Sequence, residues 1–388
     1  MTCVCDLRII KIEMFEYECM LEVPMRQSYG EVILEQERRT KRKRMKITMI
    51  LCLFVLIIVA GTAAIVYLLS KDNMQNVVGN NGVEINTEES TETRFFTESD
   101  LTEQVDMAKE AGSKELLETM KQELIAGESA VEVFRHMYKD ELVLVAGGRY
   151  HFVPVFDSIK KNDYQTENLT ILENGEYQYV ENGQVTSYKG IDVSKFQGRI
   201  DWNAVAADGA QFAFVRVGNR GYGGGTILDD DSFKRNIEGA IKAGIKVGVY
   251  FYTQALNETE LMEEVNYVLE KIAPYQIDCP VVYDVEIVGG EGGRMDELTV
   301  EERTHLTKLF CDSIQTAGYK PMIYMNLEMA ALRLNLEELE EYDKWFAYYN
   351  PELYFPYEYT VWQYSENGKV AGIDGTVDMN ISFEPIWE

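Results

Sequence analysis

The sequence predicts an α/β fold: a (β/α) barrel of the TIM type, preceded by a single transmembrane helix and a small α+β spacer. Strand-like and helix-like segments alternate over about 200 residues, from residue 188 to residue 388, and eight of them have strand character. Such repeated alternation predicts a mostly parallel sheet that is covered by helices. An uncharged apolar run nearer the N-terminus is the third observation, and it predicts the membrane span.

The strand candidates of the barrel are short runs rich in β-branched and aromatic residues. They occupy residues 190–193, 212–217, 246–252, 280–286, 321–326, 344–348, 359–364 and 377–381. Helical periodicity separates several of them, at residues 231–243, 258–272, 300–317 and 336–342. This length is short for eight strand-helix units, so we expect some helices to be reduced or missing late in the chain.

The apolar run covers residues 47–69, which are 23 consecutive residues without a charge. A helix of that length would cross roughly 30 Å of hydrocarbon. Arg and Lys cluster before the run, at residues 38–46, and basic flanks stay in the cytoplasm. We therefore expect a single-pass protein of the cell membrane, with residues 1–46 as a cytoplasmic tail and the chain after residue 70 outside the cell. A cleaved signal peptide is the alternative, but the run is long for one and starts far into the chain.

Two segments lie between the span and the barrel. Residues 70–100 are rich in Asn, Thr, Glu and Ser, which is typical of a solvated extracellular stalk. Residues 101–187 form the predicted spacer, with one or two amphipathic helices, short strands and a hairpin at Asn182-Gly183. Neither the spacer nor the tail carries a motif that assigns chemistry, and no partner of the tail follows from its residues.

The net negative charge of the chain arises entirely beyond the apolar run. The formal net charge is −28, while residues 1–46 carry a net charge of +2. An acidic surface repels phosphate backbones, so we expect no nucleic-acid partner. The six cysteines are too scattered for a disulfide framework, and the three histidines cannot be assembled by spacing into a zinc site. We therefore expect neither a metal nor a cofactor.

Carboxylates stand at the ends of several predicted strands, where barrels of this type carry their functional groups. They are Asp192, Asp284, Glu286 and Asp378. Asp284 and Glu286 are two positions apart in one strand, so both point into the barrel, roughly 6–7 Å from each other. Two such carboxylates in a partly apolar pocket cannot both ionise freely, and a proton donor beside a carboxylate suits the cleavage of a glycosidic bond. Taken alone, an Asp-x-Glu pair could also be a solvated rim or a metal site.

Aromatic and polar residues at the same strand ends favour a carbohydrate site, because flat rings stack on sugars and polar edges bind hydroxyl groups. The predicted substrate-binding residues are Arg216, Tyr250, Tyr252, Tyr324, Tyr348, Trp362 and Gln363. Among the tryptophans, Trp362 is expected to contact substrate and Trp202 to belong to the core.

Several motifs follow one another along the barrel segment. They are Gly190-Ile191-Asp192-Val193-Ser194, Gln197-Gly198, Asp201-Trp202, Phe214-Val215-Arg216, Gly248-Val249-Tyr250, Tyr283-Asp284-Val285-Glu286, Val361-Trp362-Gln363-Tyr364 and Asp378-Met379-Asn380. In this order and spacing the segment resembles glycoside hydrolase family 25, the Chalaropsis-type lysozymes, over about residues 189–383. The resemblance implies a flattened β/α barrel that acts, without a metal, as an N-acetylmuramidase on the β-1,4 bond between N-acetylmuramic acid and N-acetylglucosamine.

The resemblance also implies roles for the carboxylates. Glu286 corresponds to the general acid/base, and Asp284 to the group that orients or stabilises the acetamido group of the substrate. Asp192 and Asp378 match the other two acidic residues of the site, and retention through the acetamido oxygen is the favoured mechanism. Phe196 stands where the family often has Trp, and residues 289–297 lengthen the loop after the Asp284 strand, which leaves the shape of the cleft open.

Residues 188–388 are thus the expected catalytic domain of a membrane-anchored, extracellular muramidase whose partner is the glycan strand of peptidoglycan. Two alternatives stay open. The barrel could be a catalytically inactive peptidoglycan-binding module, or the chain could be an envelope scaffold that acts through its tail. The presence of all four carboxylates favours the enzyme.

Overall fold

The computed structural model describes residues 98–288 and 292–387. The predicted cytoplasmic tail, the predicted membrane span and the predicted stalk up to residue 97 lie outside the described residues. Within the described part of the chain, no helix is both long enough and apolar enough to cross a membrane. The membrane anchor at residues 47–69 therefore stays a prediction.

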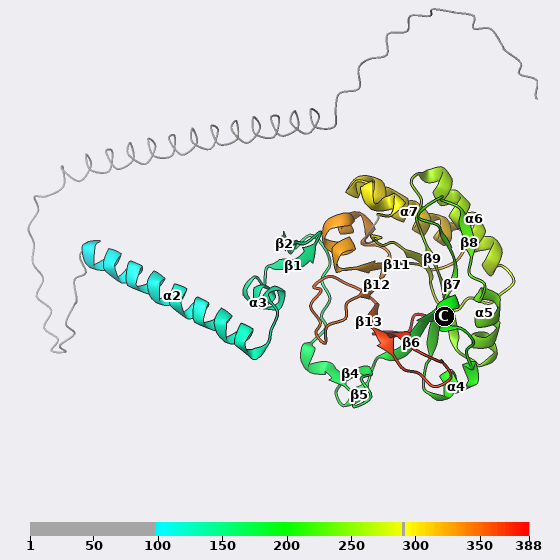
Figure 1. Cartoon of the computed structure of the whole chain (residues 1–388), viewed down its shortest axis with the longest axis horizontal. Helices are drawn as coiled ribbons and strands as arrows, with labels where there is room; N and C mark the ends of the chain where they lie inside the picture. Colours follow the sequence, from blue (N-terminus) through cyan, green and yellow to red (C-terminus); the bar gives the residue numbers. More distant parts are fainter. Residues whose placement is uncertain (1–97, 289–291, 388) are drawn as a thin grey trace, which may run out of the picture. The chain divides into compact units, whose positions relative to one another are not determined.

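Eight strands of the described chain close into a barrel, and a ninth, β8, pairs with the end of β7 (Figure 1). In chain order the strands are β6 (Tyr188–Val193), β7 (Phe212–Arg220), β8 (Ile227–Asp229), β9 (Lys246–Tyr252), β10 (Val281–Asp284), β11 (Pro321–Asn326), β12 (Asp343–Ala347), β13 (Val361–Gly368) and β14 (Val377–Ser382). The sheet has the order β6-β14-β13-β12-β11-β10-β9-β7-β8, and pairing of β6 with β7 closes it. All eight predicted strands are confirmed.

The barrel departs from the predicted TIM type in the direction of its last strand. Neighbours pair in parallel from β6 through β7, β9, β10, β11 and β12 to β13. In contrast, β14 is antiparallel to both β13 and β6. Only residues 369–376 connect β13 to β14, and a connection that short joins antiparallel neighbours, because a parallel crossover needs a dozen residues or more. The mostly parallel sheet is confirmed, whereas the complete (β/α) repeat is not.

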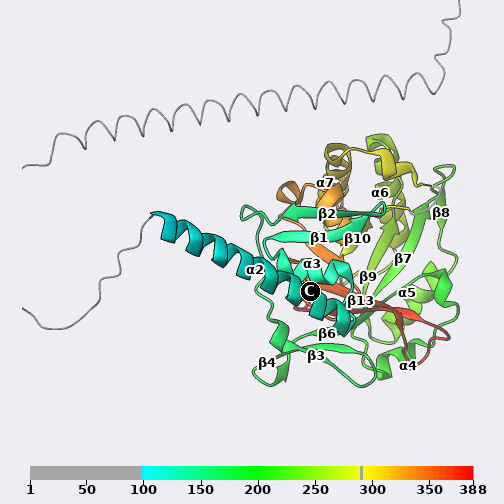
Figure 2. The ribbon, with the colours of Figure 1, turned by 60° about the vertical axis from the view of Figure 1, so that its left-hand side comes forward.

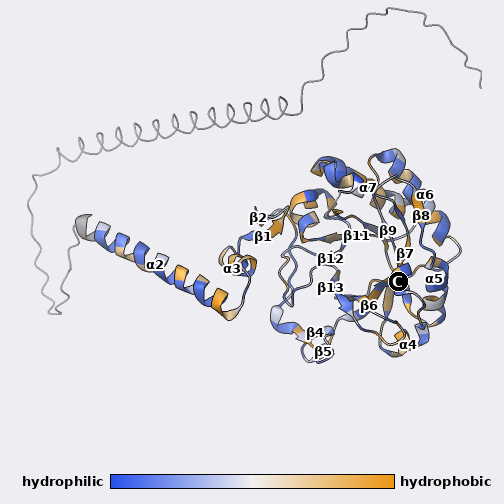
Figure 3. Ribbon diagram, viewed as in Figure 1, coloured by the Kyte–Doolittle hydropathy of each residue, from blue (hydrophilic) through white to orange (hydrophobic). Residues whose placement is uncertain are grey.

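Helices cover the barrel unevenly. They are α4 (Trp202–Ala207), α5 (Phe233–Lys242), α6 (Glu258–Ile272) and α7 (Val300–Thr316). A capping box between Thr299 and Glu302 begins α7, and Figure 3 shows hydrophilic residues along α5 and α7. The helix predicted at residues 336–342 is only a short 3₁₀ helix, Leu336–Leu339, and among the described residues no α-helix follows β12 or β13. Late loss of helices is therefore confirmed.

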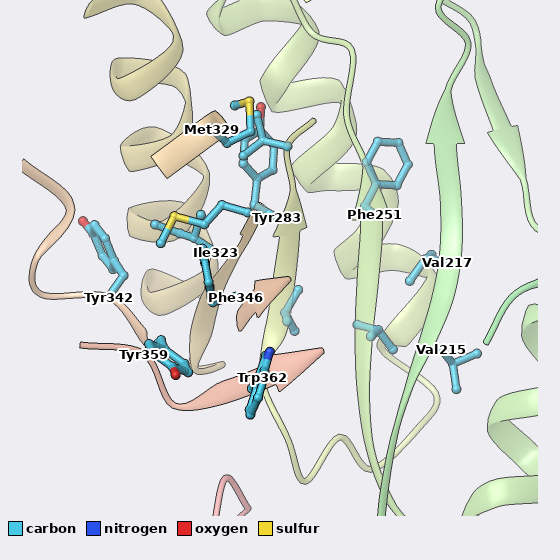
Figure 4. Packing of buried hydrophobic residues seen from close by; sticks show 14 of the residues in the cluster. Val215, Val217, Phe251, Tyr283, Ile323, Met329, Tyr342, Phe346, Tyr359 and Trp362 are labelled. Atoms are coloured by element: carbon cyan, nitrogen blue, oxygen red, sulfur yellow. The ribbon is translucent and has the colours of Figure 1, made fainter. Parts of the chain in front are cut away.

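Side chains of the barrel strands alternate between two cores. Tyr283 of β10 lies in the core between sheet and helices, where Figure 4 shows it among other buried residues, and its ring centroid is 4.5 Å from that of Phe310 in α7. Val282 belongs to a second apolar cluster inside the barrel. Val285 lies in the same core as Tyr283, so the alternation places Asp284 on the inner face, as predicted.

The predicted spacer contains two helices and short strands. These are α2 (Glu98–Ala126), α3 (Ala130–Met137), β1 (Glu141–Ala146), β2 (Arg149–Pro154), β3 (Leu169–Ile171), β4 (Tyr177–Glu181) and β5 (Gln184–Val185). Figure 2 shows β1 and β2 as paired strands near α3. The hairpin at Asn182-Gly183 is confirmed, because β4 pairs with β5 and both turn residues have positive φ, 51° and 76°. Since α2 begins at Glu98, the last residues of the predicted stalk are helical.

The spacer packs against the part of the barrel that lacks α-helices. Tyr177 stacks on Tyr364 of β13, with ring centroids 4.2 Å apart and planes inclined by 9°. Tyr164 stacks on Phe383, just after β14, at 3.9 Å. The described residues of spacer and barrel accordingly belong to one compact unit. Spacer aromatics thus bury the outer face of the late strands, as helices do for the early ones.

Candidate active site

A cavity of ≈540 Å³ opens at the end of the barrel where the parallel strands terminate, a size suited to a small ligand. All four predicted carboxylates line it, together with five of the seven predicted substrate-binding residues, namely Arg216, Tyr250, Tyr252, Tyr324 and Gln363. The remaining lining residues are Ser194, Lys195, Phe196, Gln197, Asn219, Tyr222, Leu228, Trp345, Tyr349 and Glu366. The barrel therefore brings most of the predicted site together.

Asp284 and Glu286 face this cavity at the end of β10. Burial raises the pKa of Asp284 well above its usual range, the charges of Glu286 and Asp192 raise it further, and Arg216 opposes them. Burial is also the main cause that raises the pKa of Glu286, although the Tyr324 hydroxyl opposes it. Oδ1 of Asp284 is buried without a hydrogen-bond partner among the described residues. A carboxyl group that keeps its proton near neutral pH can act as a general acid.

Asp192 and Asp378 are opposite each other in the antiparallel register of β6 and β14. Oδ1 of Asp192 accepts hydrogen bonds from Gln363 Nε2 at 2.8 Å and from Asn380 Nδ2 at 2.9 Å. Burial raises the pKa of Asp192, and these two amide donors oppose the rise. Burial and the charge of Asp192 raise the pKa of Asp378 to about 9. The hydrogen bond between the two carboxyl groups raises the pKa of Asp378 and lowers that of Asp192, so a proton shared by the pair lies on Asp378.

Neighbouring side chains fix the orientation of these two amides. The hydroxyls of Tyr324 and Tyr349 both donate to Gln363 Oε1 at 2.8 Å, which leaves the amide nitrogen for the carboxylate. Trp345 Nε1 donates to Asn380 Oδ1 at 2.8 Å with the same consequence. Because amide orientation follows from the hydrogen-bond network, the donors around Asp192 are well defined.

Arg216 carries a positive charge into this acidic cavity. Its Nε and Nη2 both lie 2.8 Å from Oδ2 of Asp230, whose side chain is fully buried. The same oxygen accepts a hydrogen bond from the backbone N–H of Lys195 at 2.9 Å. Asp230 therefore fixes both the guanidinium and the turn after β6. It was not predicted from the sequence, because its partners are far away along the chain.

Two predicted substrate-binding residues lie outside the cavity. Trp362 is 1% exposed, packs edge-on against Tyr177 of the spacer and donates from Nε1 to the carbonyl oxygen of Tyr348. The Tyr348 hydroxyl accepts a hydrogen bond from Arg135 of the spacer and donates one to Glu352. These positions correct the expectation that Tyr348 and Trp362 contact substrate, since both side chains are on the outer face of the sheet. The expectation that Trp202 is a core residue is confirmed.

Strand alternation was the signal that could have found the inner residues. Trp345, Ala347 and Tyr349 are two positions apart, and Trp345 and Tyr349 line the cavity while Tyr348 does not. Tyr222 lines the cavity from a glycine-rich loop, where alternation carries no information.

Across residues 98–288 and 292–387, no group of three or more His, Cys, Asp or Glu side chains is arranged to hold a metal ion. What the cavity offers instead is a set of carboxyl groups with raised pKa values, one fixed arginine and several tyrosines. This set can transfer protons and bind a polar, ring-shaped ligand.

Comparisons with known proteins cover the barrel. The family model described as glycosyl hydrolases family 25 matches residues 191–373. The chain is 30% identical over 203 residues to the uncharacterised protein YegX of Escherichia coli K12, a match that covers 50% of this chain and 68% of that protein. It is 27% identical over 195 residues to the autolytic lysozyme of Clostridium acetobutylicum, which covers 50% of this chain and 55% of the lysozyme.

Among solved structures, the modular autolysin LytC of Streptococcus pneumoniae in complex with a synthetic peptidoglycan ligand is 25% identical, with a TM-score of 0.46. That match covers 55% of this chain and 52% of LytC. The chain thus spans about half the length of LytC and of the autolytic lysozyme. Asp192, Asp284 and Glu286 lie within the residues that the family model matches, and Asp378 lies just beyond them. The predicted resemblance is therefore confirmed: the chain belongs to the glycosyl hydrolases of family 25.

Proposed function

We propose that the barrel is a muramidase, which hydrolyses the β-1,4 bond between N-acetylmuramic acid and N-acetylglucosamine in peptidoglycan. The observation that carries this proposal is the pair Asp284 and Glu286, whose pKa values burial raises in a cavity lined by tyrosines. The names of two relatives support it. One is the autolytic lysozyme of Clostridium acetobutylicum, and the other is lysozyme M1 of Streptomyces globisporus, 26% identical over 211 residues.

In the first step, Glu286 donates its proton to the glycosidic oxygen while the bond from that oxygen to C1 breaks. The acetamido oxygen of the same sugar forms a bond to C1 and stabilises the positive charge. The acetamido N–H donates to the carboxylate of Asp284, which lines the cavity. This hydrogen bond favours the ionised form of Asp284, which then offsets the charge of the intermediate.

In the second step, the Glu286 carboxylate accepts a proton from a water molecule as the water oxygen bonds to C1. The bond between C1 and the acetamido oxygen breaks, which restores the acetamido group and gives net retention. The charge on Asp192 contributes by raising the pKa of Glu286, so that the acid keeps its proton until the bond breaks. Arg216 partly balances the negative charge around Asp284.

The test is the release of reducing ends from purified peptidoglycan by a fragment of residues 98–388, beside Glu286→Gln. We expect products that end in reducing N-acetylmuramic acid, identified by mass spectrometry, and a loss of about 10²- to 10⁴-fold in Glu286→Gln. Glu297→Gln is the matched control, because Glu297 is exposed and lies outside the cavity lining. Reducing N-acetylglucosamine ends would contradict a muramidase, and wall binding without any release would indicate an inactive binding module.

We also propose that residues 47–69 anchor this enzyme in the cell membrane with the barrel outside. The uncharged run of 23 residues and the basic residues before it support this orientation. Protease added to wall-stripped intact cells should digest the barrel and spare an N-terminal tag on the tail. A tag that is digested while the barrel is spared, or a chain that is recovered free in the medium, would overturn the anchor.

A further inference from the structure

Phe196 stands in solvent at the edge of the cavity, with 77% of its surface exposed. Its backbone is nevertheless fixed. The N–H of Ser194 donates to Gln197 Oε1 at 2.9 Å, the N–H of Phe196 donates to Ser194 Oγ at 3.3 Å, and the N–H of Lys195 donates to the buried Asp230. A large apolar ring that is held in water by a rigid turn is pre-organised to contact a ligand.

Cations hold the Phe196 ring in place. The guanidinium carbon of Arg216 lies 5.0 Å from the ring centroid, and Lys195 Nζ lies 5.8 Å from it. Since Asp230 holds Arg216 through two nitrogens, the ring rests on a fixed charge rather than on a mobile side chain. Most of the ring remains available to a ligand.

Tyr222 is a second exposed ring that lines the same cavity, with 59% of its surface exposed. It lies in the loop between β7 and β8, next to Gly221 and ahead of three further glycines. The base of this loop is fixed, because Gly221 and Gly225 are joined by a backbone hydrogen bond of 2.9 Å and Arg220 Nη1 donates to the Gly225 carbonyl at 2.6 Å. The Tyr222 ring thus lies at the tip of a short loop whose base is held by hydrogen bonds.

The two strands that flank this loop contribute one polar and one apolar side chain to the cavity lining. Asn219 of β7 and Leu228 of β8 are directly paired in the sheet, and both line the cavity. An amide and an apolar side chain beside an aromatic ring match a saccharide, which offers hydroxyl or acetamido groups at its edge and C–H groups on its faces.

We propose that Phe196 and Tyr222 form a sugar-binding subsite, which holds a further saccharide unit of the glycan strand beyond the two units whose bond is cleaved. This proposal rests on the proposed muramidase activity and deepens it. We expect the subsite to bind ground state and transition state alike, because neither ring carries a group that takes part in breaking the bond. It therefore lowers KM for long strands and leaves kcat unchanged.

The experiment compares Phe196→Ala, Tyr222→Ala and the double variant in the full-length chain in mild detergent. The substrates are peptide-free glycan strands, both long ones and the shortest strand that the wild type cleaves. We expect each alanine to raise KM for long strands about two- to tenfold and the double variant to multiply the two factors. On the shortest strand the alanine variants should raise KM clearly less than on long strands, and Phe196→Trp should keep the wild-type KM for long strands.

Tyr150→Ala is the matched control, because Tyr150 is 48% exposed on β2 and lies outside the cavity lining. It should behave as the wild type on both substrates. Equal losses on long and short strands, a fall in kcat alone, or no change on either substrate would overturn the subsite.

Binding separates this proposal from the proposed function. Affinity for long strands is measured with the Glu286→Gln protein, with and without Phe196→Ala and Tyr222→Ala. If the wild type releases no reducing ends, the muramidase fails, yet weaker binding after the alanine changes still supports the subsite. Unchanged binding overturns the subsite even if the wild type is active.

Discussion

Arg294 holds Glu260 through both carboxylate oxygens, with nitrogen-oxygen distances of 2.7 and 3.0 Å. Arg294 follows the catalytic strand β10, whereas Glu260 lies in the first turn of α6. A Cβ placed on Gly225 would lie only 2.6 Å from the guanidinium, so Arg294 also packs directly on the loop that carries Tyr222. One side chain therefore joins the loop after β10 to the loop between β7 and β8.

Replacing Arg294 by Ala should loosen both loops. The side chains of Arg294 and Glu260 are only 17% and 23% exposed. We therefore expect Arg294→Ala to lower the free energy of unfolding by about 1–2 kcal/mol. KM for long glycan strands should rise, because Tyr222 loses its support, while kcat changes little. Arg294→Lys should fall in between, since lysine keeps the charge but not the paired contact.

Lys308→Ala is the control for Arg294→Ala, because the pair of Lys308 with Glu341 has a similar distance of 2.7 Å but is exposed. Such pairs contribute about 0–1 kcal/mol. Urea unfolding curves of the two variants give the comparison. Equal losses of stability in the two variants would show that the pair of Arg294 with Glu260 contributes no more than an exposed ion pair.

Because folding raises the pKa of Asp378, the protein should become less stable as the pH rises. Burial and the charge of Asp192 raise the pKa of Asp378 from 3.8 to about 9 in the folded chain. Between these two values the folded state binds more protons than the unfolded state, so the free energy of unfolding falls with rising pH. Asp378→Asn removes this titration and should flatten the dependence, measured by urea unfolding at several pH values. Identical slopes in wild type and Asp378→Asn would contradict a proton on Asp378 in the folded chain. Asp374→Asn is the control, because Asp374 is exposed, and it should leave the slope unchanged.

The Tyr324 hydroxyl should set the alkaline limit of activity. Burial raises the pKa of Glu286, and the Tyr324 hydroxyl lowers it when its single proton turns from Gln363 Oε1 to the Glu286 carboxylate. Tyr324→Phe should therefore move the alkaline limb of kcat against pH to higher pH, because the acid then keeps its proton longer. Tyr349→Phe is the matched control, since Tyr349 also donates to Gln363 Oε1 at 2.8 Å. A limb that moves equally in both variants, or toward lower pH in Tyr324→Phe, would refute this role.

Arg135 should matter to the barrel although it lies in the spacer. Its side chain is 8% exposed, it donates to the Val143 carbonyl and to the Tyr348 hydroxyl, and its guanidinium lies 4.5 Å from the Tyr354 ring centroid. We expect Arg135→Ala to lower the free energy of unfolding by about 2–3 kcal/mol, against almost no change for the exposed Lys139→Ala. Urea unfolding of the fragment of residues 98–388 measures both, and equal midpoints would contradict this contact.

A fragment of residues 188–388 tests the contact between spacer and barrel as a whole. Without the spacer, Trp362 and Tyr364, now 1% and 3% exposed, would lose their cover by Tyr177. We expect this fragment to aggregate or to lose cooperative unfolding, although it contains every predicted catalytic residue. A soluble fragment that unfolds at the same urea concentration as residues 98–388 would show that the predicted domain boundary is also a folding boundary.

Local pattern predicted most of the barrel and part of the site. β9, β11 and α6 agree with their predicted ends, because each is a regular run bounded by turn or capping residues. The position of Asp284 and Glu286 followed from strand alternation alone. The same rule, applied to β12 and β13, would have placed Trp345 inside and Tyr348 and Trp362 outside.

The sequence by itself determined which segments are strands, that most of them run in parallel, and which carboxylates meet at the mouth of the barrel. These depend on side-chain period and on the order of strands and helices, which are properties of neighbouring residues. Only the tertiary structure decided the direction of β14, the cover of β13 by the spacer, and the contacts of Asp192 with Gln363 and Asn380. A strand has the same alternation in either direction, and contacts between segments nearly 200 residues apart depend on how the sheet closes rather than on local pattern.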